Sequence, residues 1–125
     1  MSRRLSTALD AVTVTTTSDP IFVGRACKAT LIFTRANHSS GSSTFTVTGS
    51  LDGTTYVALN KLITNATNAI TEGLVRVASV ILSSNTSSIV SLDMQNDVYR
   101  YIKVTVTEVT DGTHTCKVLL EVDND

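Results

Sequence analysis

Hydrophobic and polar residues alternate with a period of two along most of the chain. From residue 21 to residue 34 the odd positions form an apolar face that only Arg25 interrupts, and residues 45–51, 102–106 and 114–122 alternate in the same way. A period of two is typical of strands that bury one face. Threonine and valine, which recur in these segments, favour the pleated backbone because their β-carbons are branched. The pattern predicts strands.

Turn signals separate these segments at short intervals. Asp52-Gly53 and Asp111-Gly112 are tight-turn dipeptides, since both residue types tolerate a positive φ. Leu74–Leu82 is apolar on both faces and predicts a central strand covered on both sides, whereas residues 64–73 have the composition of a loop. No segment shows a helical stripe. We therefore expect an all-β fold: one antiparallel β-sandwich, jelly-roll-like, with about eight strands.

The 125 residues are the length of one domain. We expect residues 1–9 to form a short N-terminal arm and residues 10–125 to form the sandwich. Its first strand begins near residue 11, with Val12 and Val14 on one face. The arm carries Arg3 and Arg4, while acidic residues crowd the C-terminal end, so the two ends are suited to pairing between subunits.

Composition excludes several classes of function. The 10 basic residues are balanced by 11 acidic ones, which argues against a nucleic-acid partner. No apolar stretch is long enough to span a membrane, and the chain begins without an apolar leader, so we expect neither a membrane partner nor secretion. Serine and threonine together make up 35 of the 125 residues. Strand faces lined with hydroxyl groups and few charges suit a protein that packs against copies of itself or a large assembly.

Cysteine and histidine residues do not form a recognisable catalytic or metal-binding pattern. Cys27 and Cys116 both fall in the apolar register of their strands and could face each other across the core; free thiols are expected in a reducing compartment. His38 lies in a serine-rich loop and His114 is two residues from Cys116, but no strained nucleophile turn accompanies either. We predict no catalytic residue, no cofactor and no metal, and hence no enzyme.

One acidic connection carries side chains of the kind that bind calcium. Oxygen ligands are available from Asp93, Asn96 and Asp97, but their spacing does not match a calcium-binding loop. We interpret them as solvated turn residues.

Two segments together resemble a known family. Residues 45–59, Phe-Thr-Val-Thr-Gly-Ser-Leu-Asp-Gly-Thr-Thr-Tyr-Val-Ala-Leu, resemble a hairpin of small β-sandwich proteins in tailed-phage virions. Residues 98–107, the turn at Asp111-Gly112 and residues 113–122 resemble the closing hairpin of the same proteins. The tryptophan that usually follows the Asp-Gly turn in that family is replaced here by Tyr56.

The resemblance implies a capsid decoration (cement) protein or another small virion component, such as a head–tail or tail accessory protein. Cement proteins bind the outer capsid lattice as dimers or trimers and clamp the major capsid proteins, often through arm-like termini. The expected location is thus the capsid surface of the virion, and the expected partners are the major capsid protein or another virion protein, together with further copies of the chain. The family implies no catalytic residue.

We expect Arg3, Arg4, Leu5 and Leu9 of the arm to make the contacts between subunits.

The sequence leaves two other functions open. A receptor- or glycan-binding module is the alternative, and it predicts that Tyr56, Tyr99 or Tyr101 is exposed around a concavity. An enzyme would require a pocket that brings His38 or His114 to an acid and a nucleophile.

Overall fold

The computed structural model describes residues 2–24, 26–59, 62–65, 74–92, 99–107 and 111–122, and these contain strands and no helix. No helix of this described part is therefore a candidate for crossing a membrane. The described residues form twelve strands: β1 (Ser2–Val12), β2 (Thr16–Thr17), β3 (Ile21–Phe22), β4 (Ala26–Ala36), β5 (Ser43–Ser50), β6 (Val57–Ala58), β7 (Leu62–Asn65), β8 (Leu74–Val77), β9 (Ser79–Leu82), β10 (Thr86–Leu92), β11 (Tyr101–Thr107) and β12 (Thr113–Val122).

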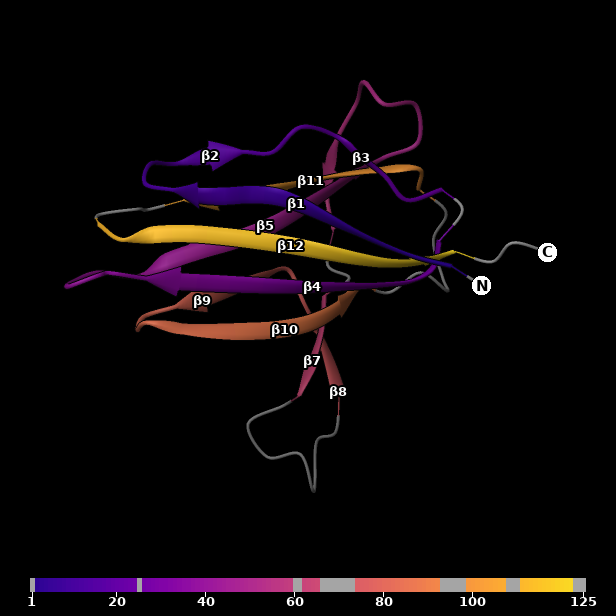
Figure 1. The fold of residues 1–125 in the computed structure, drawn as a ribbon. Helices are drawn as coiled ribbons and strands as arrows, with labels where there is room; N and C mark the ends of the chain where they lie inside the picture. Colours follow the sequence, from indigo (N-terminus) through magenta and orange to yellow (C-terminus); the bar gives the residue numbers. More distant parts are fainter. Residues whose placement is uncertain are drawn as a thin grey trace.

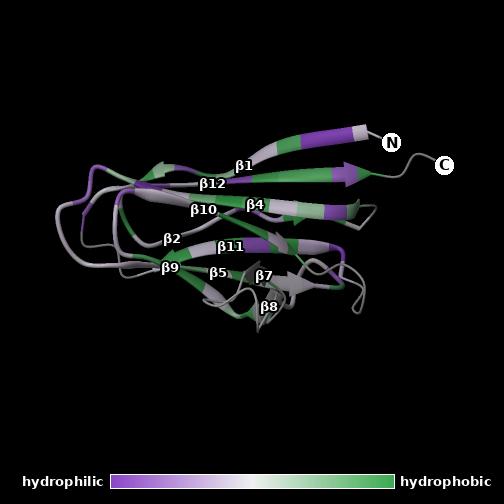
Figure 2. Ribbon diagram, turned by 90° about the horizontal axis from the view of Figure 1, so that it is seen from below, coloured by the Kyte–Doolittle hydropathy of each residue, from purple (hydrophilic) through white to green (hydrophobic). Residues whose placement is uncertain are grey.

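The strands form two antiparallel sheets that face each other as the layers of a sandwich (Figures 1 and 2). Sheet A has the strand order β1-β12-β4-β10-β7-β8. Sheet B has the order β2-β11-β5-β6, with β3 also paired to β11 and β9 to β5. The predicted all-β sandwich is confirmed, while its jelly-roll character stays a prediction.

The strand count exceeds the predicted eight because predicted strands are divided between the two sheets, and residues 21–34 and 74–82 are two examples. The apolar face of residues 21–34 is divided between β3, which pairs in sheet B, and β4, which pairs in sheet A. Residues 74–82 are divided at Ala78 in the same way, between β8 on β7 and β9 on β5. The prediction of one doubly covered central strand at residues 74–82 was therefore wrong, and Ile81 is largely exposed. A segment can therefore be apolar throughout because its two halves pair with strands of different sheets.

The core lies between the two layers and is built from alternate residues of the long strands. Sheet A contributes Leu31 and Phe33 from β4 and Val118 from β12, and sheet B contributes Phe45 and Val104. The rings of Phe33 and Phe45 stack across the layers with centroids 4.7 Å apart. Burial of such alternating apolar rows is the main favourable term that holds two sheets together.

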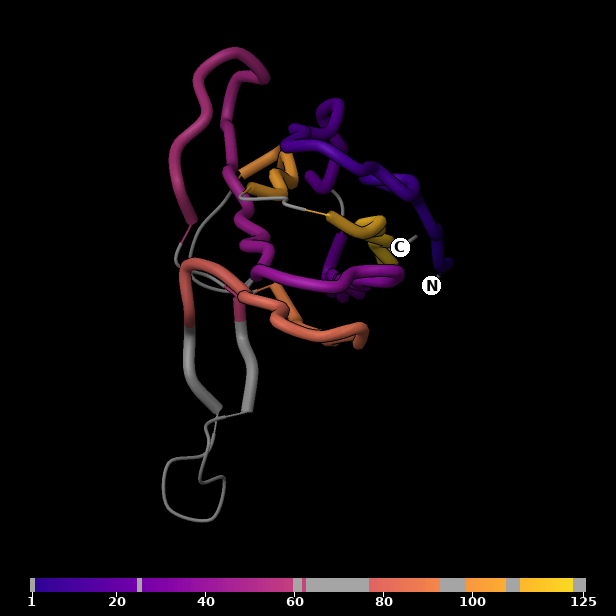
Figure 3. The backbone as a smooth tube through the Cα atoms, turned by 90° about the vertical axis from the view of Figure 1, so that its left-hand side faces the viewer, coloured from indigo at the N-terminus to yellow at the C-terminus, as the bar shows by residue number. Residues whose placement is uncertain are grey.

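Three residues that alternation assigned to the core are exposed in the structure. Leu51 precedes the Asp52-Gly53 turn, in a connection that stands away from the two layers (Figures 1 and 3). Val14 lies in the connection between β1 and β2, and Cys27 lies at the start of β4. Alternation continues into these positions in the sequence, but they lie in connections or near the start of a strand, outside the buried rows.

The segment predicted as an N-terminal arm forms most of β1, a strand of sheet A. Strand β1 pairs with β12 from Ser2 opposite Val122 to Val12 opposite His114. The register shifts between Thr7 and Leu9 and again between Leu9 and Val12, and Ala11 has a φ of 51°. Residues 2–9 are therefore continuous with the sandwich in this structure.

Candidate interaction surface

The four residues predicted to contact other subunits all lie on β1, but the structure separates them. Arg3 forms an exposed ion pair with Glu121 of β12, with Nε 3.2 Å from Oε1. Arg4 donates from Nη2 to the carbonyl oxygen of Phe22 at 2.9 Å. Both contacts hold β1 against its neighbours and leave the two guanidinium groups on the surface.

Leu5 and Leu9 differ in environment because a β-bulge separates them. Leu5 is 60% exposed, whereas Leu9 is 1% exposed and belongs to the core. A bulge inserts one unpaired residue, so strand positions beyond it point to the opposite face. Of the predicted contact residues, the structure therefore leaves Arg3, Arg4 and Leu5 on the surface and places Leu9 inside.

The outer face of sheet A carries a row of apolar side chains that crosses four strands. In antiparallel sheets, residues directly opposite each other point to the same face. Leu5 lies opposite Leu119, and Ile32 lies opposite Ile89 on one side and Lys117 on the other. Leu119 lies opposite Thr30, two positions from Ile32, so the two pairs are diagonal neighbours. We call Leu5, Leu119, Ile32 and Ile89 the apolar row.

The apolar row is open to solvent at both ends and is bordered mainly by positive charge. Ile89 is 65% exposed, and Ile32 and Leu119 are half-buried by their own neighbours on the sheet. The side chains of Arg3, Lys28 and Lys117 share this outer face with Glu121, as the strand register requires. An apolar strip with a polar border is typical of a protein-binding surface.

Sequence reasoning missed three members of the apolar row, Ile32, Ile89 and Leu119. Ile32 and Leu119 each lie between two buried residues, and Ile89 lies between half-buried Ser88 and buried Val90, at positions where alternation predicts a polar side chain. An isoleucine or leucine at such a position is the local signal, but only the strand order shows that three separate ones meet.

A second surface feature is an open groove along the free edge of β1. The groove has a volume of about 450 Å³. It is lined on one side by residues of β1 and on the other by the chain before and within β3, namely Arg4, Ser6, Thr7, Ala8, Asp19, Pro20, Ile21 and Phe22. Strand β1 and β3 belong to different sheets, and in Figure 3 the N-terminal segments that contain them lie at one margin of the molecule. The groove between them therefore lies at the margin of the sandwich.

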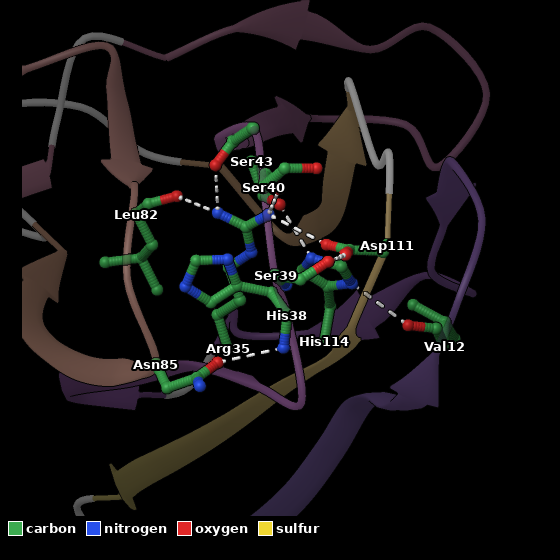
Figure 4. A network of polar contacts seen from close by, with 11 residues as sticks. Val12, Arg35, His38, Ser39, Ser40, Ser43, Leu82, Asn85, Asp111 and His114 are labelled. Carbon is green, nitrogen blue, oxygen red and sulfur yellow. Dashed lines mark hydrogen bonds and ion pairs between the residues drawn. The ribbon is translucent and has the colours of Figure 1, made fainter.

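At the other end of the sandwich, a buried arginine organises the connecting loops (Figure 4). Arg35 is 1% exposed, and its Nη1 donates to the carbonyl oxygens of Gly41 at 2.7 Å and Leu82 at 2.9 Å. Its Nη2 donates to the carbonyl oxygen of Ser40 at 2.8 Å and lies 3.6 Å from Oδ1 of Asp111. The guanidinium group of Arg35 therefore links the β4–β5 loop to the end of β9 and to Asp111 in the turn before β12.

Asp111 completes this network from the turn that precedes β12. Its Oδ2 accepts hydrogen bonds from the amide and the hydroxyl of Ser39. These hydrogen bonds hold the pKa of the Asp111 carboxyl below its usual value, because they favour its charged form. The neighbouring Gly112 has a φ of 89°, which explains the turn signal in the sequence.

His114 and His38, the two histidines considered for catalysis, lie in or beside this network (Figure 4). The Nε2 of His114 is 2.6 Å from the Ser43 hydroxyl, and its Nδ1 is 3.1 Å from the Val12 carbonyl oxygen. Because a carbonyl oxygen only accepts, Nδ1 carries a proton, and in the neutral imidazole Nε2 then accepts from the serine hydroxyl. Both His114 and Ser43 are 0% exposed, so a substrate has no access to this pair. His38 uses its amide to bind the Asn85 side chain.

The two cysteines are free and lie in different environments. Cys116 is in the core, as its register predicts, and burial raises the pKa of its thiol to about 12. Cys27 is exposed and donates from Sγ to the carbonyl oxygen of Glu121 at 3.3 Å. The two side chains therefore do not face each other across the core.

The acidic connection considered for calcium, with Asp93, Asn96 and Asp97, lies outside the described residues. Within the described part of the chain, no group of three or more His, Cys, Asp or Glu side chains is placed to hold a metal ion.

The tyrosines do not form the exposed platform that a glycan-binding module requires. Tyr99 is 6% exposed, and Tyr101 is half-buried with its ring 5.5 Å from that of Phe22. Tyr56 is half-buried beneath the ammonium group of Lys103, which lies 4.3 Å from the ring centroid. The faces of these rings are occupied by the protein itself.

No protein-family model and no curated protein matches the sequence. The structure is similar to that of the SPBc2 prophage-derived protein YomS, with a TM-score of 0.65 and 14% identity over 96% of this chain and 94% of that one. A chain from Bacillus endospore appendages, described as disulfide-linked pili, gives a TM-score of 0.47 and 10% identity over 97% and 83% of the two chains. The structure of PirA gives a TM-score of 0.43 and 9% identity over 95% of this chain and 93% of that one. The chain therefore shares its fold with a prophage-derived protein.

Proposed function

We propose that the protein is a structural component of a tailed-phage virion, of the capsid-decoration type, and that it binds the capsid through the outer face of sheet A. The apolar row carries this proposal, since it leaves Leu5 and Ile89 exposed to solvent on one face of sheet A. Burying such a strip against another protein is favourable in proportion to its apolar area. The charges around the strip match a partner surface that is apolar with an acidic border.

Two further observations support a binding role of this kind. The fold is shared with a prophage-derived protein, in agreement with the resemblance of the two hairpins to virion proteins. The Ser43–His114 pair, which is the arrangement closest to a catalytic one among the described residues, is sealed in the core and serves the architecture. The mechanism is adhesion: modest contacts, repeated by many copies on a symmetric lattice, add up to strong retention.

Co-sedimentation with capsid shells tests the proposal. Shells of the phage that encodes the protein, assembled without it, are mixed with the purified chain, and the bound amount is measured against concentration. We expect saturation at a fixed number of copies per capsid protein. The variants Ile89→Lys and Ile32→Lys place a charge in the apolar row, and we expect each to weaken binding at least tenfold.

Leu51→Lys is the matched control, because Leu51 is equally exposed but lies on the β5–β6 connection. It should bind as the wild type does, and circular dichroism should show all three variants folded. Absence of wild-type co-sedimentation, or unchanged binding by both isoleucine variants, contradicts the proposal.

A further inference from the structure

The free edge of β1 is the longest unpaired strand edge that the described residues present at the sandwich margin. Strand β1 spans eleven residues and pairs with β12 along one side only. Its other side faces the groove, where the backbone N–H and C=O groups of a strand edge are available to a further strand. A strand added there would continue sheet A.

The strand register limits how a second copy of β1 can pair with the first. The regular part of β1 precedes the bulge, and there Arg3, Leu5 and Thr7 point to the outer face while Arg4 and Ser6 alternate with them. In an antiparallel pair related by a two-fold axis, one residue lies opposite its own copy, and opposite residues share a face.

Charge and apolar matching select one register. A two-fold axis at Arg3 or Arg4 would place a guanidinium group directly against its own copy, which is destabilising. An axis at Leu5 places the two Leu5 side chains together and sets Arg3 opposite Thr7. The apolar row then runs without interruption from Leu119 and Leu5 of one copy into Leu5 and Leu119 of the other.

In this register, Asp19 at the groove is an acidic partner for Arg4 of the second copy. The chain between β2 and β3 runs opposite to β1 (Figure 1). Phe22 accepts the hydrogen bond of Arg4, so Asp19, which comes three residues earlier and also lines the groove, lies toward the later residues of β1. Asp19 is exposed and has no ion pair with another described residue. Because Arg4 of a second copy would lie opposite Ser6, its guanidinium group would face Asp19, and the symmetry makes this contact twice.

We propose that two copies of the chain associate through their β1 edges, antiparallel, with Leu5 on the two-fold axis and Arg4 of each copy facing Asp19 of the other. The two A sheets then form one continuous sheet whose outer face presents both apolar rows. This pairing does not depend on capsid binding, so the mass of the free protein tests it separately from the proposed function.

Light scattering and disulfide trapping test the geometry. The wild type should have the mass of a dimer. In a Cys27→Ser background, which leaves only the buried Cys116, Leu5→Cys should form an intermolecular disulfide in high yield under mild oxidation. The equally exposed Leu51→Cys should not. A monomeric wild type, or equal trapping at both positions, overturns the proposal.

Charge reversal tests the Arg4–Asp19 contact. Arg4→Asp alone and Asp19→Arg alone each bring like charges together at both contacts, and we expect each to dissociate at least tenfold more readily than the wild type. Mixing the two variants restores opposite charges at both contacts and should yield a heterodimer. If the mixture stays monomeric, or if Leu5→Cys is trapped only on the capsid protein when shells are added, a second copy is not the occupant of this edge.

Discussion

Arg35 is a charged residue at a position of β4 that points into the protein. Its neighbours in the same row are Phe33 and Leu31, and its guanidinium group donates to three carbonyl oxygens, two in the β4–β5 loop and one at the end of β9. Buried charges are tolerated when they are paired and hydrogen-bonded, as here. The exposed Arg3–Glu121 pair is a different case, because water already solvates both groups.

We expect Arg35→Met to lower the free energy of unfolding by about 3 kcal/mol, because it leaves buried carbonyl oxygens and Asp111 without their cation. Arg3→Met, the control at the exposed ion pair, should cost less than about 1 kcal/mol. Urea unfolding followed by circular dichroism measures both. Equal effects of the two substitutions would contradict the structural role given to Arg35.

At the scale of the element, β1 combines a surface half and a core half in one strand. The register shift between Thr7 and Leu9 divides them, so that two leucines four residues apart have opposite environments. Sequence reasoning treated both as arm residues, because neither the bulge nor the pairing with β12 leaves a signal in the residues around them.

Leu9→Ala should destabilise the protein by about 3 kcal/mol, because it opens a cavity in the core. Leu5→Ala removes the same atoms from an exposed position, and its effect should stay within about 0.5 kcal/mol. Thermal unfolding of both variants, at a concentration where the wild type has one defined mass, measures the difference. A small effect at Leu9 would mean that residues 1–9 behave as a detachable arm.

For the whole molecule, a single core joins the two sheets. The chain crosses from one sheet to the other between β3 and β4 and again at Ala78, and the stacked rings of Phe33 and Phe45 connect the layers. With so many long-range connections, neither sheet retains a buried face if the other opens, which is the condition for all-or-none unfolding.

We therefore expect both layers to report one transition. In the Cys27→Ser variant, labelling of the buried Cys116 thiol follows sheet A, whereas tyrosine fluorescence, to which Tyr101 of β11 contributes, follows sheet B. The two probes should give the same free energy of unfolding across a urea series. Labelling of Cys116 at urea concentrations where the fluorescence is still native would show that β1 or its neighbours open separately.

The sequence alone determined the strand class, the buried rows of β5, β11 and β12, and the turns at Asp52-Gly53 and Asp111-Gly112. These depend on the period of two and on the local conformational preferences of glycine and branched residues. Tertiary structure alone decided that residues 21–34 and 74–82 divide between sheets, that Leu9 is buried while Leu5 is not, and that Leu119, Ile32 and Ile89 meet on one face. The physical reason is that strand pairing joins residues far apart in the chain, and only the pairing fixes which alternate face a partner sheet covers.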